Sequence, residues 1–215
     1  MKILSVNVGL PREIEWRGKI VRTSIFKEPV FGSVPVRILN LDGDQQSDLS
    51  VHGGVDKAVY VYPSEHYAFW RGDLPEQDLS WGAFGENLTT EGLRENLVNI
   101  GDSFRIGSAE FTVTQPRMPC FKLGIRFGRN DIVKRFLSSG RTGFYLRVNR
   151  EGQVNAGDSI ERLKMSEHRV TVADIANLYV SDANSQELLK KVSDLAELPA
   201  SWRDYFRKRL WNPDA

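Results

Sequence analysis

The sequence predicts a mainly β fold with α-helices: a β-barrel core with short inserted helices, followed by a C-terminal three-helix bundle. Two observations predict it. Up to about residue 165, short segments of alternating apolar and polar residues are separated by turn residues, which is typical of antiparallel or mixed barrels. After Met165 the apolar spacing becomes that of a helix. We therefore expect a β-barrel domain over residues 1–165 and a helical bundle over residues 166–215.

Seven segments of the first part have the composition or alternation of strands. They are 3–8, 34–38, 58–62, 104–106, 110–114, 144–148 and 159–163. The sequence Gly-Asp-Ser occurs twice, at 101–103 and 157–159, each time just before an alternating run. We interpret both as turns, because glycine allows positive φ and aspartate bonds its own backbone. Two inserted helices are expected over 64–71 and 131–137.

Three apolar stripes at helical spacing predict the C-terminal helices. Thr171 comes directly before the first stripe, and its spacing to Asp174 is that of a capping box, which would open the helix. The aromatic residues of the last stripe are expected in the core, with its basic residues facing solvent. The stripes are Val172, Ile175 and Tyr179; Leu188, Leu189, Val192 and Leu195; and Trp202, Tyr205, Phe206 and Leu210.

The composition excludes several classes of protein. The 215 residues include 29 basic and 28 acidic ones, a net charge of +1, which does not indicate a general nucleic-acid or membrane-surface binder. One cysteine excludes an intrachain disulfide or a zinc site of several cysteines, and fits a reducing compartment. No apolar stretch approaches a membrane span, and polar or turn residues interrupt the N-terminus too early for a signal peptide. We expect a cytoplasmic protein.

The charge is unevenly distributed along the chain. Residues 115–150 contain nine basic residues and one acidic residue, a net charge of +8, which leaves −7 for the remainder. The single cysteine, Cys120, lies in this segment near Arg117 and Lys122. Nearby cations favour the thiolate, the form in which cysteine attacks electrophiles and binds metals. The alternative is a buried cysteine that acts as a small apolar side chain.

Another candidate site is the segment from His52 to Lys57, which contains two adjacent glycines. Glycines let backbone N–H groups approach a ligand, and His52 and Lys57 offer further donors to an anion. The alternative is a simple turn that leads into the following strand.

Two more segments carry polar groups beside glycine. The stretch 82–90 presents Asn87 and Thr89, an amide and a hydroxyl suited to orienting a polar ligand, although a structural turn explains it equally well. Arg141 lies between Gly140 and Gly143, and its guanidinium suits phosphate because it bonds two oxygens at once. Together, the four segments predict an anion pocket that contains a thiol.

In this order, these segments resemble those of the MOSC family, named after the C-terminal domain of molybdenum cofactor sulfurases, and most closely its stand-alone bacterial YiiM-type members. The likeness covers nearly the whole chain, and its most specific part surrounds Cys120. It rests on residues 4–9, 51–54, 84–89, 115–123, 140–145 and 156–158, together with the helical tail.

The resemblance implies a MOSC-type β-barrel that binds the molybdenum cofactor (Mo-molybdopterin), with Cys120 as the protein ligand of the metal. A soft thiolate suits that role. The pterin carries a phosphate, for which cations are needed. The expected cofactor-binding residues are Arg117, Lys122, Arg141, Lys57, Asn87 and Thr89. Cys120 is also expected to be catalytic, with His52 as a proton donor because histidine titrates near neutral pH.

For YiiM-type proteins the resemblance implies reduction of N-hydroxylated small molecules, including hydroxylaminopurine-type bases, to amines. The sequence has no flavin, iron–sulfur or nicotinamide motif, so a separate electron-donating reductase is the expected partner.

Two alternatives remain open. In the first, Cys120 carries sulfur, or the domain carries the cofactor, without redox turnover. The second, an RNA-binding barrel that uses the basic segment, is least favoured because interleaved aromatic residues are missing. We expect neither nucleic acid nor a membrane as a partner, and a homodimer is among the assemblies that the sequence allows.

Overall fold

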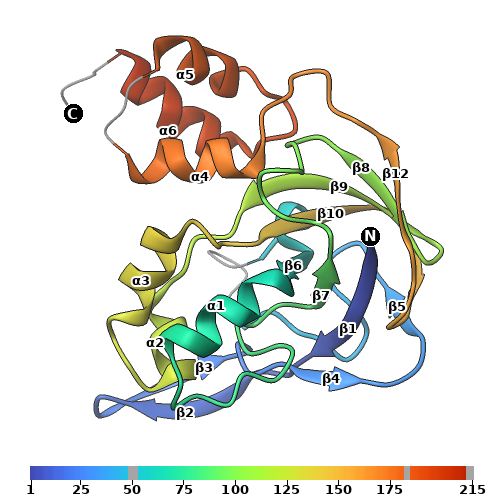
Figure 1. Ribbon diagram of the computed structural model, residues 1–215, viewed down its shortest axis with the longest axis vertical. Helices are drawn as coiled ribbons and strands as arrows, with labels where there is room; N and C mark the ends of the chain where they lie inside the picture. Colours follow the sequence, from blue (N-terminus) through green and yellow to red (C-terminus); the bar gives the residue numbers. More distant parts are fainter. Residues whose placement is uncertain (48–52, 182–184, 212–215) are drawn as a thin grey trace.

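The computed structural model describes residues 1–47, 53–181 and 185–211, and has a mixed α/β fold that is rich in sheet (Figure 1). Within these ranges one eight-stranded sheet dominates, and its strands follow the order β12-β8-β9-β10-β6-β7-β1-β4. Its strands are β1 (Lys2–Val8), β4 (Glu28–Val30), β6 (Val59–Pro63), β7 (Leu88–Glu91), β8 (Ser103–Ile106), β9 (Ala109–Pro116), β10 (Phe144–Arg150) and β12 (Ile160–Lys164).

The sheet curls back on itself. The β6–β7 pair is parallel and the other neighbours in the order are antiparallel. Near the start of β1, the backbone N–H of Ile3 donates to the carbonyl of Asp158, and the N–H of Ile160 donates to that of Met1, at 2.9 and 3.0 Å. These bonds, with an antiparallel bridge between Lys2 and Ser159, join β1 to the start of β12, while the pairs between the named strands of the described residues show no closed barrel of the kind that we predicted.

Two small sheets accompany the large one. β2 (Arg12–Trp16) and β3 (Lys19–Thr23) form a hairpin, and β5 (Val34–Val36) pairs with β11 (Gly152–Val154). Each of the seven predicted strand segments contains or overlaps a strand, which confirms those predictions. The β2–β3 hairpin was not predicted, because most of its side chains are exposed and half of the residues in its two short strands are charged. Its turn, Arg17-Gly18, has positive φ at both residues.

Three short helices flank the sheet: α1 (Glu65–Asp73), α2 (Phe121–Phe127) and α3 (Ile132–Ser139), with a single 3₁₀ turn at η1 (Val55–Lys57). The first and third confirm the two inserted helices that we predicted. The second was missed because it has only seven residues and contains Gly124, which is a poor helix former. It begins directly after Cys120, so the proline-containing segment before it is a loop, as its prolines indicated.

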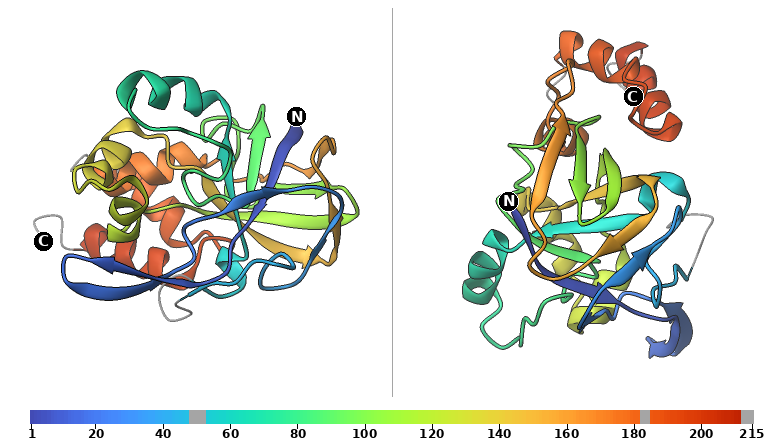
Figure 2. Two further views of the ribbon diagram at one scale, coloured as in Figure 1. Left: turned by 90° about the horizontal axis from the view of Figure 1, so that it is seen from below. Right: turned by 90° about the vertical axis from the view of Figure 1, so that its right-hand side faces the viewer.

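The C-terminal helices are α4 (Val172–Val180), α5 (Gln186–Ser193) and α6 (Ala200–Trp211), and they form a layer at one end of the sheet (Figure 2). The predicted capping box is present: the Asp174 N–H donates to the Thr171 hydroxyl, and the Thr171 N–H donates to the Asp174 carboxylate. Buried residues of all three helices, such as Phe206, belong to the same apolar cluster as the sheet. The helices are therefore held on the sheet by a continuous core.

A second apolar cluster supports the other side of the sheet. It contains the buried aromatic residues Tyr60, Tyr62, Trp70, Phe84 and Phe136, and it fixes the ends of β6 and β10 against α1 and α3. None of the helices in the described ranges has the length and apolarity that a membrane crossing requires.

Candidate functional site

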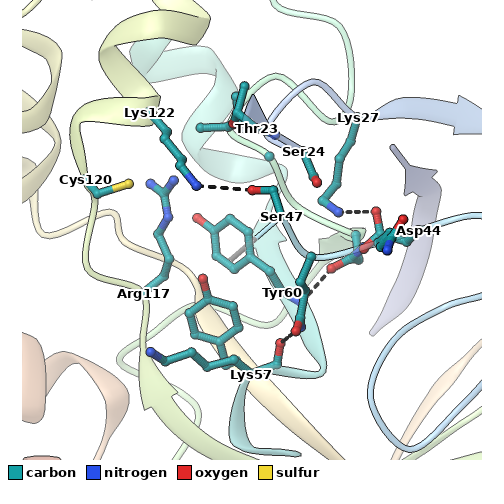
Figure 3. Close-up of a pocket in the computed structure, with 16 residues that line it drawn as sticks. Thr23, Ser24, Lys27, Asp44, Ser47, Lys57, Tyr60, Arg117, Cys120 and Lys122 are labelled. Atoms are coloured by element: carbon teal, nitrogen blue, oxygen red, sulfur yellow. Dashed lines mark hydrogen bonds and ion pairs between the residues drawn. The ribbon is translucent and has the colours of Figure 1, made fainter. Parts of the chain in front are cut away.

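A pocket open to solvent lies between the loop after β9 and the chain that follows β3. It encloses about 620 Å³ including its open mouth. Figure 3 shows Arg117, Cys120 and Lys122 on one side and Ser24, Lys27 and Asp44 on the other. Seven of the predicted site residues fall in the described ranges, and five of them line this pocket. These are Cys120, Arg117, Lys122, Lys57 and Asn87.

Cys120 is a free, half-buried cysteine at the junction between the β9 loop and α2. Its backbone is extended, with φ −123° and ψ 177°. Figure 3 shows its sulfur turned into the pocket, on the same side as the guanidinium of Arg117 and the ammonium of Lys122. The sequence segment that we singled out therefore presents its thiol and both of its cations to one space.

Arg117 is a buried cation, 6% exposed. Its guanidinium carbon lies 5.2 Å from the centroid of the Tyr60 ring and 5.1 Å from that of the Phe136 ring. The Arg117 side chain also forms a hydrogen bond with the Tyr145 side chain. Burial disfavours the charged form, but Tyr60, Tyr145 and Cys120 outweigh burial and raise the pKa of Arg117. Its Nη1 atom is buried without a hydrogen-bond partner among the described residues. A charged group with an unused donor is thus part of the pocket wall.

Two lysines add positive charge. Lys122 is 9% exposed, and its Nζ donates to the Ser47 hydroxyl at 3.1 Å. Burial lowers the pKa of Lys57, although Asp56 opposes the shift. With Lys27 on the opposite wall, four basic side chains line the pocket of the thiol, a combination that suits an anionic ligand.

The opposite wall holds a buried ion pair between Lys27 and Asp44. Burial lowers the pKa of Lys27, although Asp44 opposes the shift. The Asp44 carboxylate also accepts from the Gly9 N–H and from Asn87 Nδ2, each at 2.9 Å. Nearby, the hydroxyl of Ser24 is buried and has no partner in the described part of the chain.

Asn87 has a structural role as well as a place in the pocket wall. Its Oδ1 accepts a hydrogen bond of 3.0 Å from the backbone N–H of Tyr60. With its bond to Asp44, the Asn87 amide therefore links β6 to the loop that carries Asp44. The hydrogen bonds fix the orientation of this amide at the pocket.

The remaining predicted residues lie elsewhere. Thr89 is fully buried, and its hydroxyl donates to Glu86 and accepts from Asn7. The Arg141 guanidinium lies 3.9 Å from the centroid of the Phe69 ring and donates to the Ser139 carbonyl. Neither lines the pocket, so the structure does not bring them to the predicted anion site. His52 lies outside the described residues.

The segment that contains Arg141 supports the pocket through its backbone. The Tyr60 and Tyr62 hydroxyls donate to the carbonyls of Thr142 and Arg141, at 2.8 and 3.1 Å. The Gly143 N–H donates to Glu95 at 2.6 Å, and the Gly143 carbonyl accepts from the Arg117 N–H at 3.2 Å. This turn therefore holds the backbone from which Arg117 enters the pocket.

Several pocket residues were not predicted from the sequence, among them Lys27, Asp44, Ser24, Tyr60 and Tyr145. They come from different strands and loops, and no short motif contains two of them with a recognisable spacing. Only Gly43, directly before Asp44, marked a turn in the sequence. Among the described residues no group of three or more histidine, cysteine or acidic side chains forms a metal site.

Comparison with known proteins identifies the family to which this chain belongs. Residues 48–161 match the model of the MOSC domain, more than half of the chain. The chain belongs to the MOSC family. Residues 170–211 of this MOSC protein match the YiiM-like 3-alpha helix domain, which corresponds to α4, α5 and α6.

Individual relatives agree with this assignment. The uncharacterized protein YflK of Bacillus subtilis is 43% identical over 96% of this MOSC chain and 93% of its own length. A protein of Gibberella moniliformis named reductase is 33% identical over 90% of this chain, which corresponds to 35% of the fungal protein. The crystal structure of YiiM from Geobacillus stearothermophilus superimposes with a TM-score of 0.81 at 33% identity, covering 97% of this chain and 98% of that one.

Proposed function

We propose that this MOSC protein binds the molybdenum cofactor and reduces N-hydroxylated compounds, such as hydroxylaminopurine-type bases, to amines. The observation that carries the proposal is the meeting of Cys120 with Arg117 and Lys122 in one pocket (Figure 3). Membership of the MOSC family and the relative named reductase support it.

The pocket fits an anionic cofactor with a soft metal. The Arg117 Nη1 and Ser24 Oγ atoms are buried and lack partners among the described residues, and an unpaired buried donor costs about 1–3 kcal/mol. Oxygen atoms of a bound anion would satisfy both groups. The thiolate of Cys120 is the soft ligand that such a metal needs, and with so few protein ligands the cofactor itself has to supply the others.

The residues of the chain then have distinct tasks. Cys120 holds the metal, while Arg117 and Lys122 neutralise the thiolate and the cofactor's negative groups. The Lys27–Asp44 pair and Asn87 keep the opposite wall in place. When bound, the cofactor supplies the two-electron redox chemistry.

The proposed reaction is R–NHOH + 2 H⁺ + 2 e⁻ → R–NH₂ + H₂O. The N–O bond breaks, the nitrogen is reduced, and the oxygen leaves as water. A separate reductase supplies the electrons. Lys57 lies in the pocket with a lowered pKa, so it is a candidate proton donor beside His52, which we proposed from the sequence.

The decisive experiment compares the protein with Cys120→Ser and Cys120→Ala, all produced in cells that synthesise the cofactor. We measure the molybdenum and pterin content of each protein. We also measure the reduction of 6-hydroxylaminopurine, with reduced methyl viologen as the electron donor. We expect equimolar molybdenum in the parent protein, and loss of both metal and activity in the variants. Full activity of either variant with bound metal would contradict the proposal.

A carrier without redox turnover is the second candidate, because a half-buried free cysteine beside cations also suits a persulfide. Intact mass spectrometry of the untreated protein distinguishes the two. A carrier of sulfur shows the added mass of one sulfur atom at Cys120, and a carrier of cofactor contains molybdopterin but does not reduce 6-hydroxylaminopurine.

A further inference from the structure

A second pocket meets the first one at Lys57, Cys120 and Tyr145, which line both. It encloses about 560 Å³ including its open mouth. One wall is the loop after β9, with Met118, and another is Trp202 of α6. The C-terminal helices therefore contribute a side chain to a space that opens on the Cys120 thiol. We call it the Trp202 pocket.

The lining of this pocket differs in chemistry from that of the first. Lys57 is its one charged residue among the described ones, and the rest of its lining includes Met118 and the rings of Tyr145 and Trp202. The first pocket brings together Arg117, Lys122 and Lys27 as well. An anion therefore prefers the first pocket, and a largely uncharged group prefers the second.

Trp202 is suited to bind a flat ring. We predicted it as a core residue, but its side chain is only half-buried. Its ring packs against Tyr179 and Phe206, with centroids 5.3 and 5.8 Å away, and these neighbours hold it in place. A fixed aromatic face beside a reactive centre provides a stacking surface for planar heteroaromatic groups.

We infer that the Trp202 pocket binds the ring of a planar heteroaromatic N-hydroxylated substrate, and that Trp202 is a specificity-determining residue. This inference rests on the proposed function, because it places the N–O group of the substrate beside Cys120. It gives the helical domain a part in substrate selection: rings that stack on Trp202 are favoured over N-hydroxylated compounds without a ring. The pterin of the cofactor is the other planar group available, and the test separates the two.

The test compares Trp202→Ala with Trp211→Ala, which removes the same residue type from the same helix at a site 80% exposed. Three quantities are measured: the Kd of adenine by calorimetry, kcat/KM for 6-hydroxylaminopurine and for N-methylhydroxylamine, and molybdenum content. In Trp202→Ala we expect the Kd of adenine and the KM for 6-hydroxylaminopurine to rise about tenfold. Turnover of N-methylhydroxylamine falls far less, and molybdenum content equals that of Trp211→Ala.

Met118→Ala keeps the inference testable if Trp202→Ala fails to fold, because Met118 lies in the loop wall and not in α6. Its effect on 6-hydroxylaminopurine is expected in the same direction and to be smaller. Thermal unfolding of each variant establishes that it is folded.

The outcomes separate this inference from the proposed function. If both substrates lose activity equally, or if Trp202→Ala loses molybdenum, the ring in the pocket is not the substrate's and the inference is wrong. If 6-hydroxylaminopurine is reduced and Trp202→Ala behaves like Trp211→Ala, the inference fails and the proposed function stands. If no N-hydroxylated compound is reduced but adenine binding depends on Trp202, the function fails and the ring-binding pocket stands.

Discussion

Tyr60 connects the buried cation of the pocket to the turn that supports it. Its ring centroid lies 5.2 Å from the guanidinium carbon of Arg117, and its hydroxyl donates to the Thr142 carbonyl at 2.8 Å. Because the next residue, Gly143, accepts from the Arg117 N–H, Tyr60 and Arg117 hold the same turn from two sides. The position of Arg117 thus depends on residues that are distant in sequence.

Removal of the Tyr60 hydroxyl tests this connection. In Tyr60→Phe the ring remains beside Arg117 but the buried Thr142 carbonyl loses its donor. We expect the free energy of unfolding to fall by about 1–2 kcal/mol, as measured by urea unfolding. Tyr205→Phe, at a tyrosine 38% exposed, is the matched control and should cost little; an equal loss in both would show that the hydrogen bond is unimportant.

Replacement of Arg117 by methionine should separate stability from binding. The change removes a buried donor that has no partner among the described residues, so the apoprotein should keep or gain stability. Cofactor content should fall strongly, and Arg117→Lys should show an intermediate loss, because lysine keeps the charge but not the two-pronged donor geometry. Arg117→Met that retains the parent's molybdenum content would remove Arg117 from the proposed site.

Lys122 and Arg141 offer a direct test of which cation serves the pocket. Lys122 lines it and Arg141 does not. Dialysis at increasing salt should release the cofactor from Lys122→Gln at lower salt than from the parent protein, with an affinity loss of about tenfold. Arg141→Gln, which removes one positive charge from the same basic segment, should behave as the parent. Equal release from both variants would mean that Arg141 also reaches the cofactor.

Gly143 should tolerate no side chain. Its φ is +63°, and an added Cβ would lie 2.4 Å from the Val61 carbonyl oxygen. Gly143→Ala should therefore lower the free energy of unfolding by more than the roughly 1–2 kcal/mol of a left-handed conformation alone. Gly140→Ala is the control, because Gly140 has a φ of +66° but open space around it. Urea unfolding measures both, and similar losses would show that the close contact relaxes without cost.

The buried lysine of the pocket predicts a pH dependence. Because the pKa of Lys27 is lowered from 10.5, unfolded Lys27 binds a proton more strongly than folded Lys27. Its contribution to stability is therefore smallest below the folded pKa and grows as the pH rises toward 10.5. The unfolding free energy of the parent minus that of Lys27→Met should increase as the pH rises from the folded pKa of Lys27 toward 10.5. Lys19→Met, at an exposed lysine, should show no such trend, and a decrease with Lys27→Met would contradict the prediction.

The basic segment shows how far local charge could predict the site. Of its nine basic residues, only Arg117 and Lys122 line the pocket. Others form ion pairs at the surface, such as Arg135 with Asp73 and Arg147 with Asp56. The pocket obtains further cations from Lys27 and Lys57, which lie outside the segment. The basic segment of the sequence therefore predicted the position of the thiol and of two neighbouring cations. It did not predict the other two cations of the pocket.

What the sequence alone determined was local. The two-residue period of the strands, the capping box at Thr171 and the loop before Cys120 depend on nearby residues, and the structure contains all of them. The helices of the tail follow from their apolar spacing for the same reason.

Only the tertiary structure decided which side chains meet. The parallel pairing of β6 with β7 and the position of β10 between β6 and β9 bring Tyr60, Asn87 and Tyr145 to the loop of Cys120. The packing of α6 brings Trp202 to the same loop. These contacts join residues tens of positions apart, and their stability comes from burial of the whole core, which no local pattern encodes.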